Sequence, residues 1–324
     1  MKRRWMAVGV ATVAALGLTA CGPQGGGGSA SEEYPTQNIE MLVGFAAGGH
    51  NDATARKFAE GLEEELGQKI LVVNREGGGG SLAATEAATV APDGYKILFA
   101  PTGAFTSTML QQDVSYQIED FRSVQPVAEN TFVVAVPADS PFKTFEDLQK
   151  AQGRLTYSAF GEGHPTHLIG AGIVKENDLT GDLVAFPGSP PALQAIVNGD
   201  VDFGIQDVTS ALPRLDSGEI RALAVTTEYV PEALGDVPSI QEFGLEEYLF
   251  AGSQALVVPK DAPDHVVDTL TEAAQATVES EEFTRFVQDS GGTIPEVGGE
   301  EWFTEYMPAE LERFRTLYAD LGIQ

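Results

Sequence analysis

Short apolar segments alternate with amphipathic helical segments along most of the chain, and this alternation limits the possible folds more than any other feature. In the first part, predicted strands at 39–45, 69–73 and 95–100 are separated by predicted helices at 52–66 and 81–90. In the longer helix the apolar side chains recur every three or four residues, as on one buried face. Because strand–helix–strand order needs a crossover, the strands are predicted to pair in parallel in an open α/β sheet.

The same alternation recurs further along the chain. Strands are predicted at 132–137, 155–159, 183–186, 201–205 and 222–226, and helices at 144–151, 167–176, 190–198 and 208–217. A last strand is predicted at 253–258, followed by helices at 264–279, 281–290 and 299–320. Three helices and one strand do not easily form a domain, so we expect them to pack back onto the first unit. The prediction is two α/β domains, 34–129 plus 252–324 and 130–251, joined by crossing segments near Asn130 and Gly252.

The charge and the cysteine count exclude several classes of protein. The chain has 19 Lys and Arg against 48 Asp and Glu, a net charge of −29. Nucleic-acid binding requires a basic surface, so no nucleic-acid partner is expected. Because Cys21 is the only cysteine, no intramolecular disulfide and no cysteine-based zinc site can form. We expect neither a metal nor a cofactor.

The N-terminal segment is typical of an exported lipoprotein. Met1–Arg4 carries three cations and is followed by a mostly apolar run from Trp5 to Ala20. That run ends in Leu18-Thr19-Ala20-Cys21, which resembles a lipobox, where the signal is cut before a cysteine that carries lipid. The predictions are a signal peptide at 1–20, lipidated Cys21, a flexible Gly/Ser-rich tether through 33, and export followed by anchoring to the cell membrane on its extracytoplasmic side. The alternative is an ordinary secretory signal.

Glycine-rich turns follow the strands of the first predicted domain. The first turn reads Phe45-Ala46-Ala47-Gly48-Gly49-His50-Asn51-Asp52 and leads into a helix. The free N–H groups and positive dipole end of that helix suit a carboxylate or phosphate. The alternative is a tight turn before a capped helix. No Gly-Lys-Ser/Thr follows, so this is not a Walker loop.

Two further turns are expected at the same sheet edge, where ligands of open α/β sheets bind. Residues 74–81 end in four glycines and Ser81, and a dinucleotide-binding fingerprint is incomplete there. The other turn contains Thr102 and Gly103 directly after a strand.

The second predicted domain repeats this arrangement. Its turns contain Ser158, Gly161, Gly163, His164, Thr166 and His167, then Gly188 and Ser189, and finally Asp207. His164 and His167 are three residues apart, but Pro165 lies between them and no third metal ligand is near, so hydrogen bonding or capping is favoured. A Gly-x-Ser-x-Gly elbow is absent. A secreted hydrolase that uses Ser158 or Ser189 is the alternative from another class, and a sensory binding protein on the same scaffold is a further alternative.

In combination, these segments resemble the Bug solute-binding receptors of tripartite tricarboxylate transporters over about residues 34–323. The resemblance rests on Tyr34-Pro35, Gly48-Gly49-His50-Asn51-Asp52 with Ala55-Arg56, Leu66-Gly67-Gln68, Ala91-Pro92-Asp93-Gly94-Tyr95, Tyr157-Ser158-Ala159, Gly188-Ser189 with Pro191-Ala192-Leu193, Gly199-Asp200-Val201-Asp202, and Val237-Pro238-Ser239. It implies a type II periplasmic-binding architecture: two open α/β domains with a ligand cleft between them.

The resemblance also implies a function. Such a receptor captures a small organic carboxylate, such as a di- or tricarboxylate, an amino acid or an aromatic acid, and passes it to membrane permease subunits. It is not an enzyme, and we expect a monomer whose domains close over the ligand. The predicted substrate-binding residues are Phe45, Gly48, Gly49, His50, Asn51, Asp52, Ser81, Thr102, Gly103, Ser158, Gly161, Gly163, His164, Thr166, His167, Gly188, Ser189 and Asp207.

Three departures from the family pattern border the expected cleft. His50 stands where relatives often have Ser or Thr, Phe186-Pro187 where they often have Tyr-Lys, and His164-Pro165 where small polar residues are usual. The ligand therefore does not follow from the resemblance. One hypothesis is that protonated His50 binds a carboxylate, with affinity rising from pH 8 to 6. The other is that His50 only caps or packs.

Overall fold

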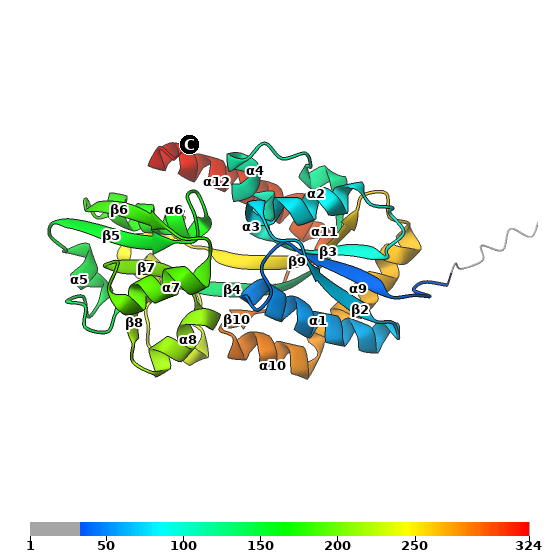
Figure 1. The fold of residues 1–324 in the computed structure, drawn as a ribbon, viewed down its shortest axis with the longest axis horizontal. Coiled ribbons are helices and arrows are strands. Elements are labelled where there is room, and N and C mark those ends of the chain that lie inside the picture. The colour runs from blue at the N-terminus through cyan, green and yellow to red at the C-terminus, as the bar shows by residue number, and fades with distance from the viewer. Residues whose placement is uncertain (1–32, 324) are drawn as a thin grey trace, which may run out of the picture. The chain divides into compact units, whose positions relative to one another are not determined.

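The computed structural model describes residues 33–323 (Figure 1). The predicted signal peptide at 1–20, Cys21 and all but the last residue of the tether lie outside the described residues. None of the helices within 33–323 combines the length and the apolar character that a membrane span needs.

The first half is built on three parallel strands. β1 (Ile39–Val43) lies between β2 (Ile70–Asn74) and β3 (Lys96–Pro101) and pairs with both in parallel. Helices α1 (His50–Leu66) and α2 (Ser81–Thr89) make the crossovers. The predicted parallel pairing and both helices are confirmed.

The second half repeats the plan. β5 (Arg154–Ala159) lies between β6 (Thr180–Ala185) and β7 (Phe203–Asp207), again in parallel. The connecting helices are α6 (Pro165–Glu176), α7 (Ser189–Asn198) and α8 (Val208–Asp216), and β8 (Ile220–Val225) pairs antiparallel with β4. The predicted strand–helix alternation is confirmed here too.

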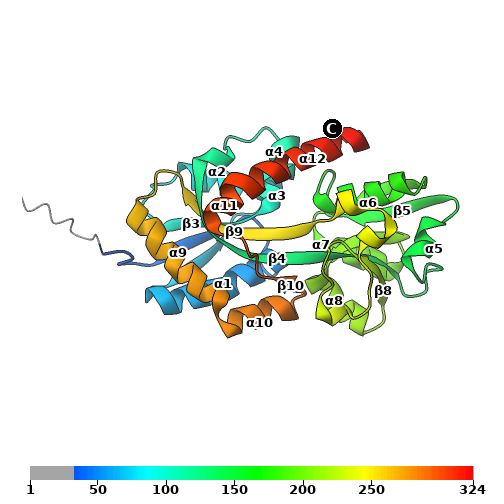
Figure 2. The same cartoon turned by 180° about the vertical axis from the view of Figure 1, so that it is seen from behind.

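Two long strands connect the halves. β4 (Phe121–Pro137) and β9 (Ala251–Pro259) pair antiparallel and run between the two groups of helices in both views (Figures 1 and 2). Of β4, only 132–137 was predicted. Its first part alternates irregularly, and its pairing with β9 shifts register at Ser123/Gln125 and at Pro126/Ala128. Such irregularities accommodate Pro126, which cannot donate a ladder hydrogen bond.

The remaining elements are short or lie near the C-terminus. The short helices are η1 (Gly78–Gly80), α3 (Thr102–Phe105), α4 (Ser107–Gln111), η2 (Ile118–Asp120), α5 (Phe145–Gln149), η3 (Glu232–Leu234), η4 (Ile240–Phe243) and η5 (Glu246–Tyr248). The terminal elements are α9 (Asp264–Glu279), α10 (Glu281–Asp289), β10 (Gly292–Thr293), α11 (Gly299–Glu301), η6 (Trp302–Tyr306) and α12 (Met307–Leu321).

The terminal helices do not all return to the first half. Leu270 of α9 and Phe283 of α10 join the core around β1, as expected. In α12, Met307 packs in the first half, but Phe314 and Leu317 join the core of the second half. The expectation is therefore right for α9 and α10 and wrong for the end of α12, because the apolar face of α12 extends from the core of the first half into that of the second.

Candidate binding site

The predicted binding loops lie at corresponding edges of the two halves. Because β1, β2 and β3 are parallel, the turns after them share one sheet edge, and the same holds for β5, β6 and β7. The two sets of turns meet at His50, whose Nδ1 lies 3.0 Å from Thr209 Oγ1 on α8. We call this region the junction.

Asp52 holds the first turn in place. Its Oδ2 accepts hydrogen bonds from the Gly48 N–H at 2.8 Å and from Arg56 Nε at 3.0 Å, and its Oδ1 accepts from Asn74 Nδ2 at 3.0 Å. Burial alone would raise the pKa of Asp52, but the bonds from Arg56, Gly48 and Asn74 outweigh it and lower that pKa. The carboxylate is therefore occupied by its own turn, and Asp52 acts as a positioning residue.

His50 begins α1 and faces the second half. Burial lowers the pKa of its imidazole, while the nearby Asp207 carboxylate opposes that shift. The ring is therefore neutral near pH 7, which disfavours the protonated His50 of the pH hypothesis. Its Nε2 and the Asn51 Oδ1 are buried and have no hydrogen-bond partner within residues 33–323.

Some of the other predicted residues of the first half have polar groups that are already hydrogen-bonded within the protein. The buried Thr102 hydroxyl donates to the Ser253 carbonyl at 3.0 Å, and the Gly103 carbonyl accepts from Ser107 Oγ at 3.2 Å. Phe45 lies against Gly80, and Ser81 is the first residue of α2. Thr102 and Gly103 therefore serve the local fold of α3.

His164 caps the start of α6. Its Nδ1 accepts the Thr166 N–H at 3.2 Å, and the Thr166 hydroxyl accepts the Phe160 N–H at 3.0 Å. Burial, and secondarily His167, lowers the pKa of His164 to about 4. The capping role weighed from the sequence is therefore what the structure shows for His164.

Gly163 is held from three sides. Its N–H donates to His167 Nδ1 at 2.8 Å, and its carbonyl accepts from the Tyr318 hydroxyl of α12. Its φ is +68°, and a Cβ there would overlap Gln111 of α4. Burial lowers the pKa of His167, with Glu162 opposing. The turn after β5, which also contains Gly161, thus lies against α4 of the first half and is hydrogen-bonded to the end of α12.

Buried polar groups lie near the carboxyl ends of β5 and β7. Ser158 and Gln206 are both fully buried, and Ser158 Oγ and Gln206 Nε2 have no partner within residues 33–323. Ser189 Oγ donates to Gln206 Oε1 at 3.1 Å, which leaves the amide nitrogen as a donor. Sequence reasoning placed Ser158 and Ser189 here but missed Gln206; a polar residue on a buried strand directly before Asp207 was the available signal.

The helices at the junction differ in their caps. Asp207 Oδ1 accepts the Ser210 N–H at 2.8 Å and caps α8, as His164 caps α6. Gly49 and Gly188 precede α1 and α7 and provide no side-chain cap. The first N–H groups of α1 are therefore better placed than those of α6 and α8 to bind an anion. In α7 only Ser189 has an N–H among the first three residues, because Pro190 and Pro191 have none.

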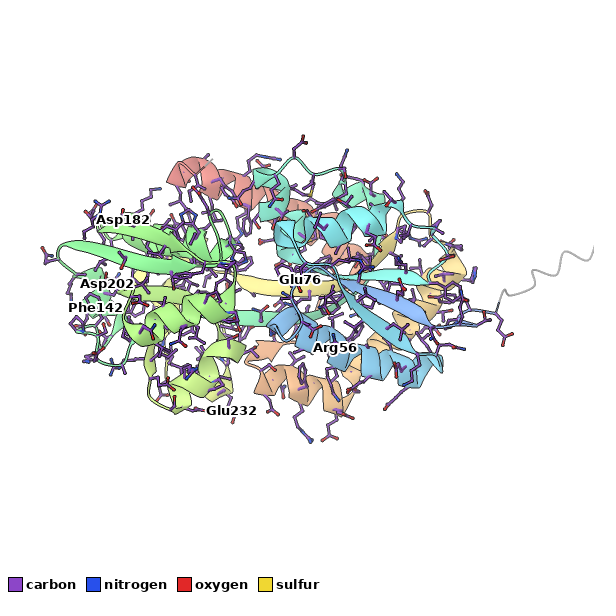
Figure 3. The ribbon with its side chains drawn as sticks, in the orientation of Figure 1. Arg56, Glu76, Phe142, Asp182, Asp202 and Glu232 are labelled. Atoms are coloured by element: carbon purple, nitrogen blue, oxygen red, sulfur yellow. The ribbon has the colours of Figure 1, made fainter. Side chains whose placement is uncertain are left out.

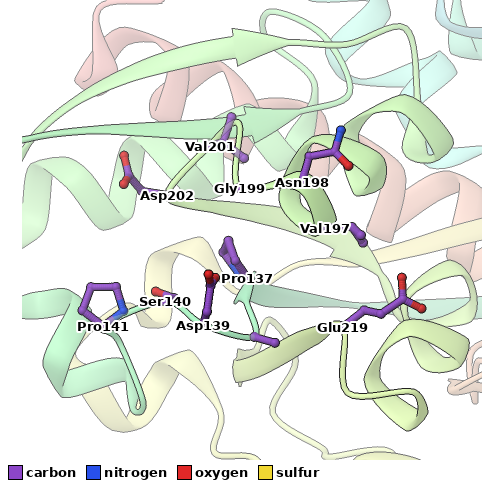
Figure 4. Close-up of a pocket in the computed structure, with 11 residues that line it drawn as sticks. Pro137, Asp139, Ser140, Pro141, Val197, Asn198, Gly199, Val201, Asp202 and Glu219 are labelled. Atoms are coloured by element: carbon purple, nitrogen blue, oxygen red, sulfur yellow. The ribbon is translucent and has the colours of Figure 1, made fainter.

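A hollow of about 580 Å³ lies elsewhere (Figure 4). It is lined by Pro137, Asn198, Asp202 and Glu219, from the end of β4, the end of α7 and the starts of β7 and β8. Asp202 lies well away from Arg56 and Glu76 of the first half (Figure 3). This hollow shares no residue with the predicted binding loops. Within residues 33–323 no group of three or more His, Cys, Asp or Glu is placed to hold a metal ion.

Solved structures share this architecture. A protein of R. palustris solved with adipate is 27% identical, with a TM-score of 0.82, covering 90% of this chain and 99% of that one. MatC from Rhodopseudomonas palustris, solved with bound malate, is 25% identical, with a TM-score of 0.78, covering 88% and 99%. The predicted periplasmic-binding architecture is confirmed.

Sequence comparison gives the family. A relative from Agrobacterium vitis, the "UPF0065 protein in the TAR-I ttuE-ttuC' intergenic region", is 31% identical over 302 residues, which are 90% of this chain and 87% of the relative. Residues 54–319 match the family described as "Tripartite tricarboxylate transporter family receptor". The chain belongs to this receptor family, as the resemblance predicted.

Proposed function

We propose that the protein is an extracytoplasmic receptor that binds a small organic carboxylate at the junction and delivers it to the permease of a tripartite tricarboxylate transporter. Two relatives of similar fold were solved with adipate and with malate. The proposed domains keep the bounds expected from the sequence, 34–129 plus 252–324 and 130–251, with the end of α12 packed onto the second domain. We propose that the protein acts as a monomer whose halves close over the ligand.

The observation that supports this best is the pair of buried donors on β5 and β7. Ser158 Oγ and Gln206 Nε2 lie near the carboxyl ends of the neighbouring parallel strands β5 and β7, and Gln206 is hydrogen-bonded to Ser189, the first residue of α7. A buried polar group without a partner costs about 1–3 kcal/mol. A ligand carboxylate that accepts from these donors removes that cost. This local donor set explains how a chain of net charge −29 can bind an anion.

The geometry offers less to the hydrolase alternative. Neither the Ser158 nor the Ser189 hydroxyl hydrogen-bonds to a histidine in the described part of the chain, and Ser189 donates to Gln206 instead. A serine nucleophile needs an adjacent base.

Calorimetric titration of the purified protein with di- and tricarboxylates tests the proposal. We expect binding of one ligand per chain, with the ligand recovered unchanged, and at least tenfold weaker binding for Ser158→Ala. Ser123→Ala is the matched control, because Ser123 Oγ is also buried and has no partner in the described part of the chain, but it lies on β4 outside the binding loops. If neither variant changed the affinity, the donor pair would not be the binding site. Turnover of the ligand would favour the hydrolase.

Anchoring through Cys21 is proposed from the sequence. Cys21→Ser removes the only acceptor thiol, so the protein is expected to move from the membrane fraction to the soluble fraction. One acyl chain gives only marginal binding, so wild-type retention requires more than one. The measurement is fractionation of cells with immunodetection and mass spectrometry of the mature N-terminus. Membrane retention of the cleaved variant would contradict lipid anchoring.

A further inference from the structure

The hydrogen bonds of Thr209 define the tautomer of His50. Thr209 Oγ1 lies 2.8 Å from the Ser290 carbonyl oxygen and 3.0 Å from His50 Nδ1. A threonine hydroxyl has one hydrogen, and a carbonyl oxygen can only accept. The hydroxyl therefore donates to Ser290, and its oxygen accepts from His50. His50 Nδ1 consequently carries a proton.

With Nδ1 protonated, Nε2 of the neutral ring is a lone-pair acceptor. Burial keeps the ring neutral near pH 7, although the Asp207 carboxylate acts in the other direction. Nε2 is buried, and no donor within residues 33–323 reaches it. Among the described residues, the buried Nε2 is thus an unpaired acceptor, which costs free energy in the folded protein. A ligand removes that cost only if it supplies a hydrogen-bond donor.

A carboxylate oxygen cannot supply that donor, because it only accepts. We infer that His50 selects ligands that carry an O–H or N–H group beside a carboxylate, with Nε2 as the acceptor of that group. The inference rests on the proposed function and adds to it the class of substrate. In this arrangement Ser158 and Gln206 donate to the carboxylate, while His50 accepts from the neighbouring hydroxyl or ammonium group.

The two kinds of contact come from opposite halves. His50 begins α1, and its partner Thr209 is on α8, two residues after the capping Asp207 and three after Gln206. A hydroxy- or amino-carboxylate that spans these groups therefore hydrogen-bonds to both halves at once. A site that hydrogen-bonds a ligand group discriminates strongly against an analogue lacking it, because its buried partner is left unpaired.

Calorimetry with matched acids tests this inference. Succinate, malate and aspartate share a four-carbon dicarboxylate skeleton. Succinate carries no further donor, malate carries a hydroxyl and aspartate carries an ammonium group. Tricarballylate and citrate differ only by a hydroxyl, which citrate has. At pH 7.5 we expect the wild type to bind the donor-bearing member of a set at least tenfold more tightly, and the comparison of malate with aspartate shows which donor is used.

Variants connect the preference to the ring. In His50→Ala, the affinities for the donor-bearing and donor-lacking acids should differ by no more than about threefold. His50→Gln should retain the wild-type preference, because an amide offers an N–H for Thr209 and a carbonyl acceptor. His265→Ala is the control, because His265 is exposed on α9. Thermal unfolding of each variant without ligand checks that it folds.

Each result decides a different point. If none of the five acids bound the wild type but another small carboxylate did, this inference would be overturned and the proposed function would stand. If no carboxylate bound, both would be rejected. If the five acids bound without preference, or with the same preference in wild type and His50→Ala, only the assignment of His50 would be overturned. A preference for succinate that disappears in His50→Ala would mean that the ring donates, which also overturns it.

Discussion

Replacing His164 by asparagine is expected to make the stability of the protein less sensitive to acid between about pH 6.5 and 4. The reason is the cap of α6, where His164 Nδ1 accepts the Thr166 N–H and can do so only while unprotonated. Asparagine caps a helix with its side-chain oxygen and does not titrate in this range. The variant keeps the cap and loses the proton-binding group.

The sign and size follow from the pKa of His164. Burial lowers it from 6.5 to about 4 in the folded protein. Between these values the unfolded chain binds a proton at this position and the folded chain does not, so stability is present above pH 6.5 and falls as the pH drops. At about 1.4 kcal/mol per pH unit, the wild type loses on the order of 3 kcal/mol over the window through this group.

Urea unfolding of both proteins at pH 7, 5.5 and 4.5, followed by circular dichroism, measures this difference. The titration of the 48 carboxylic acids is common to both proteins and cancels in the comparison. His265→Asn, at an exposed position on α9, should follow the wild type. If the free energy of unfolding depended on pH in the same way for wild type and His164→Asn, folding would not hinder protonation of His164, and the prediction would be wrong.

The alternation of strands and helices predicted the parallel parts of both halves because each such segment carries its own apolar pattern. The first part of β4 was missed, since Pro126 and two register shifts break that pattern, and only pairing with the distant β9 keeps it extended. The end of α12 was misplaced for a related reason. Its apolar face indicated burial but not which half buries it.

The turns that form the candidate site were predicted, but the hydrogen-bonding roles of their side chains were not. Thr102 and Ser253 are hydrogen-bonded although 151 residues separate them, so the sequence could not show that this hydroxyl is occupied. The free donor of Gln206 depends in the same way on Ser189. Whether a polar group is available to a ligand depends on partners that only the folded chain brings together.

Asp52 is the position where this distinction has the largest expected effect. Asp52→Ala removes the acceptor of the Gly48 N–H, of Arg56 and of Asn74, so we expect the free energy of unfolding to fall by about 2–3 kcal/mol. The estimate stays below that for a fully buried ion pair, because half of the Arg56 side chain is exposed. The free energy of unfolding of Asp52→Asn, which keeps an acceptor but loses the charge, should lie between those of the wild type and Asp52→Ala.

Urea unfolding and titration with a bound carboxylate measure the two consequences separately. Glu60→Ala is the matched control on α1: Glu60 pairs with Lys57 at the surface, where such a pair contributes at most about 1 kcal/mol. Because Asp52 acts on the turn and not on the ligand, Asp52→Asn should lose affinity only in proportion to its loss of stability. A large loss of affinity with wild-type stability would instead place the Asp52 carboxylate in contact with the ligand, as the sequence alone suggested.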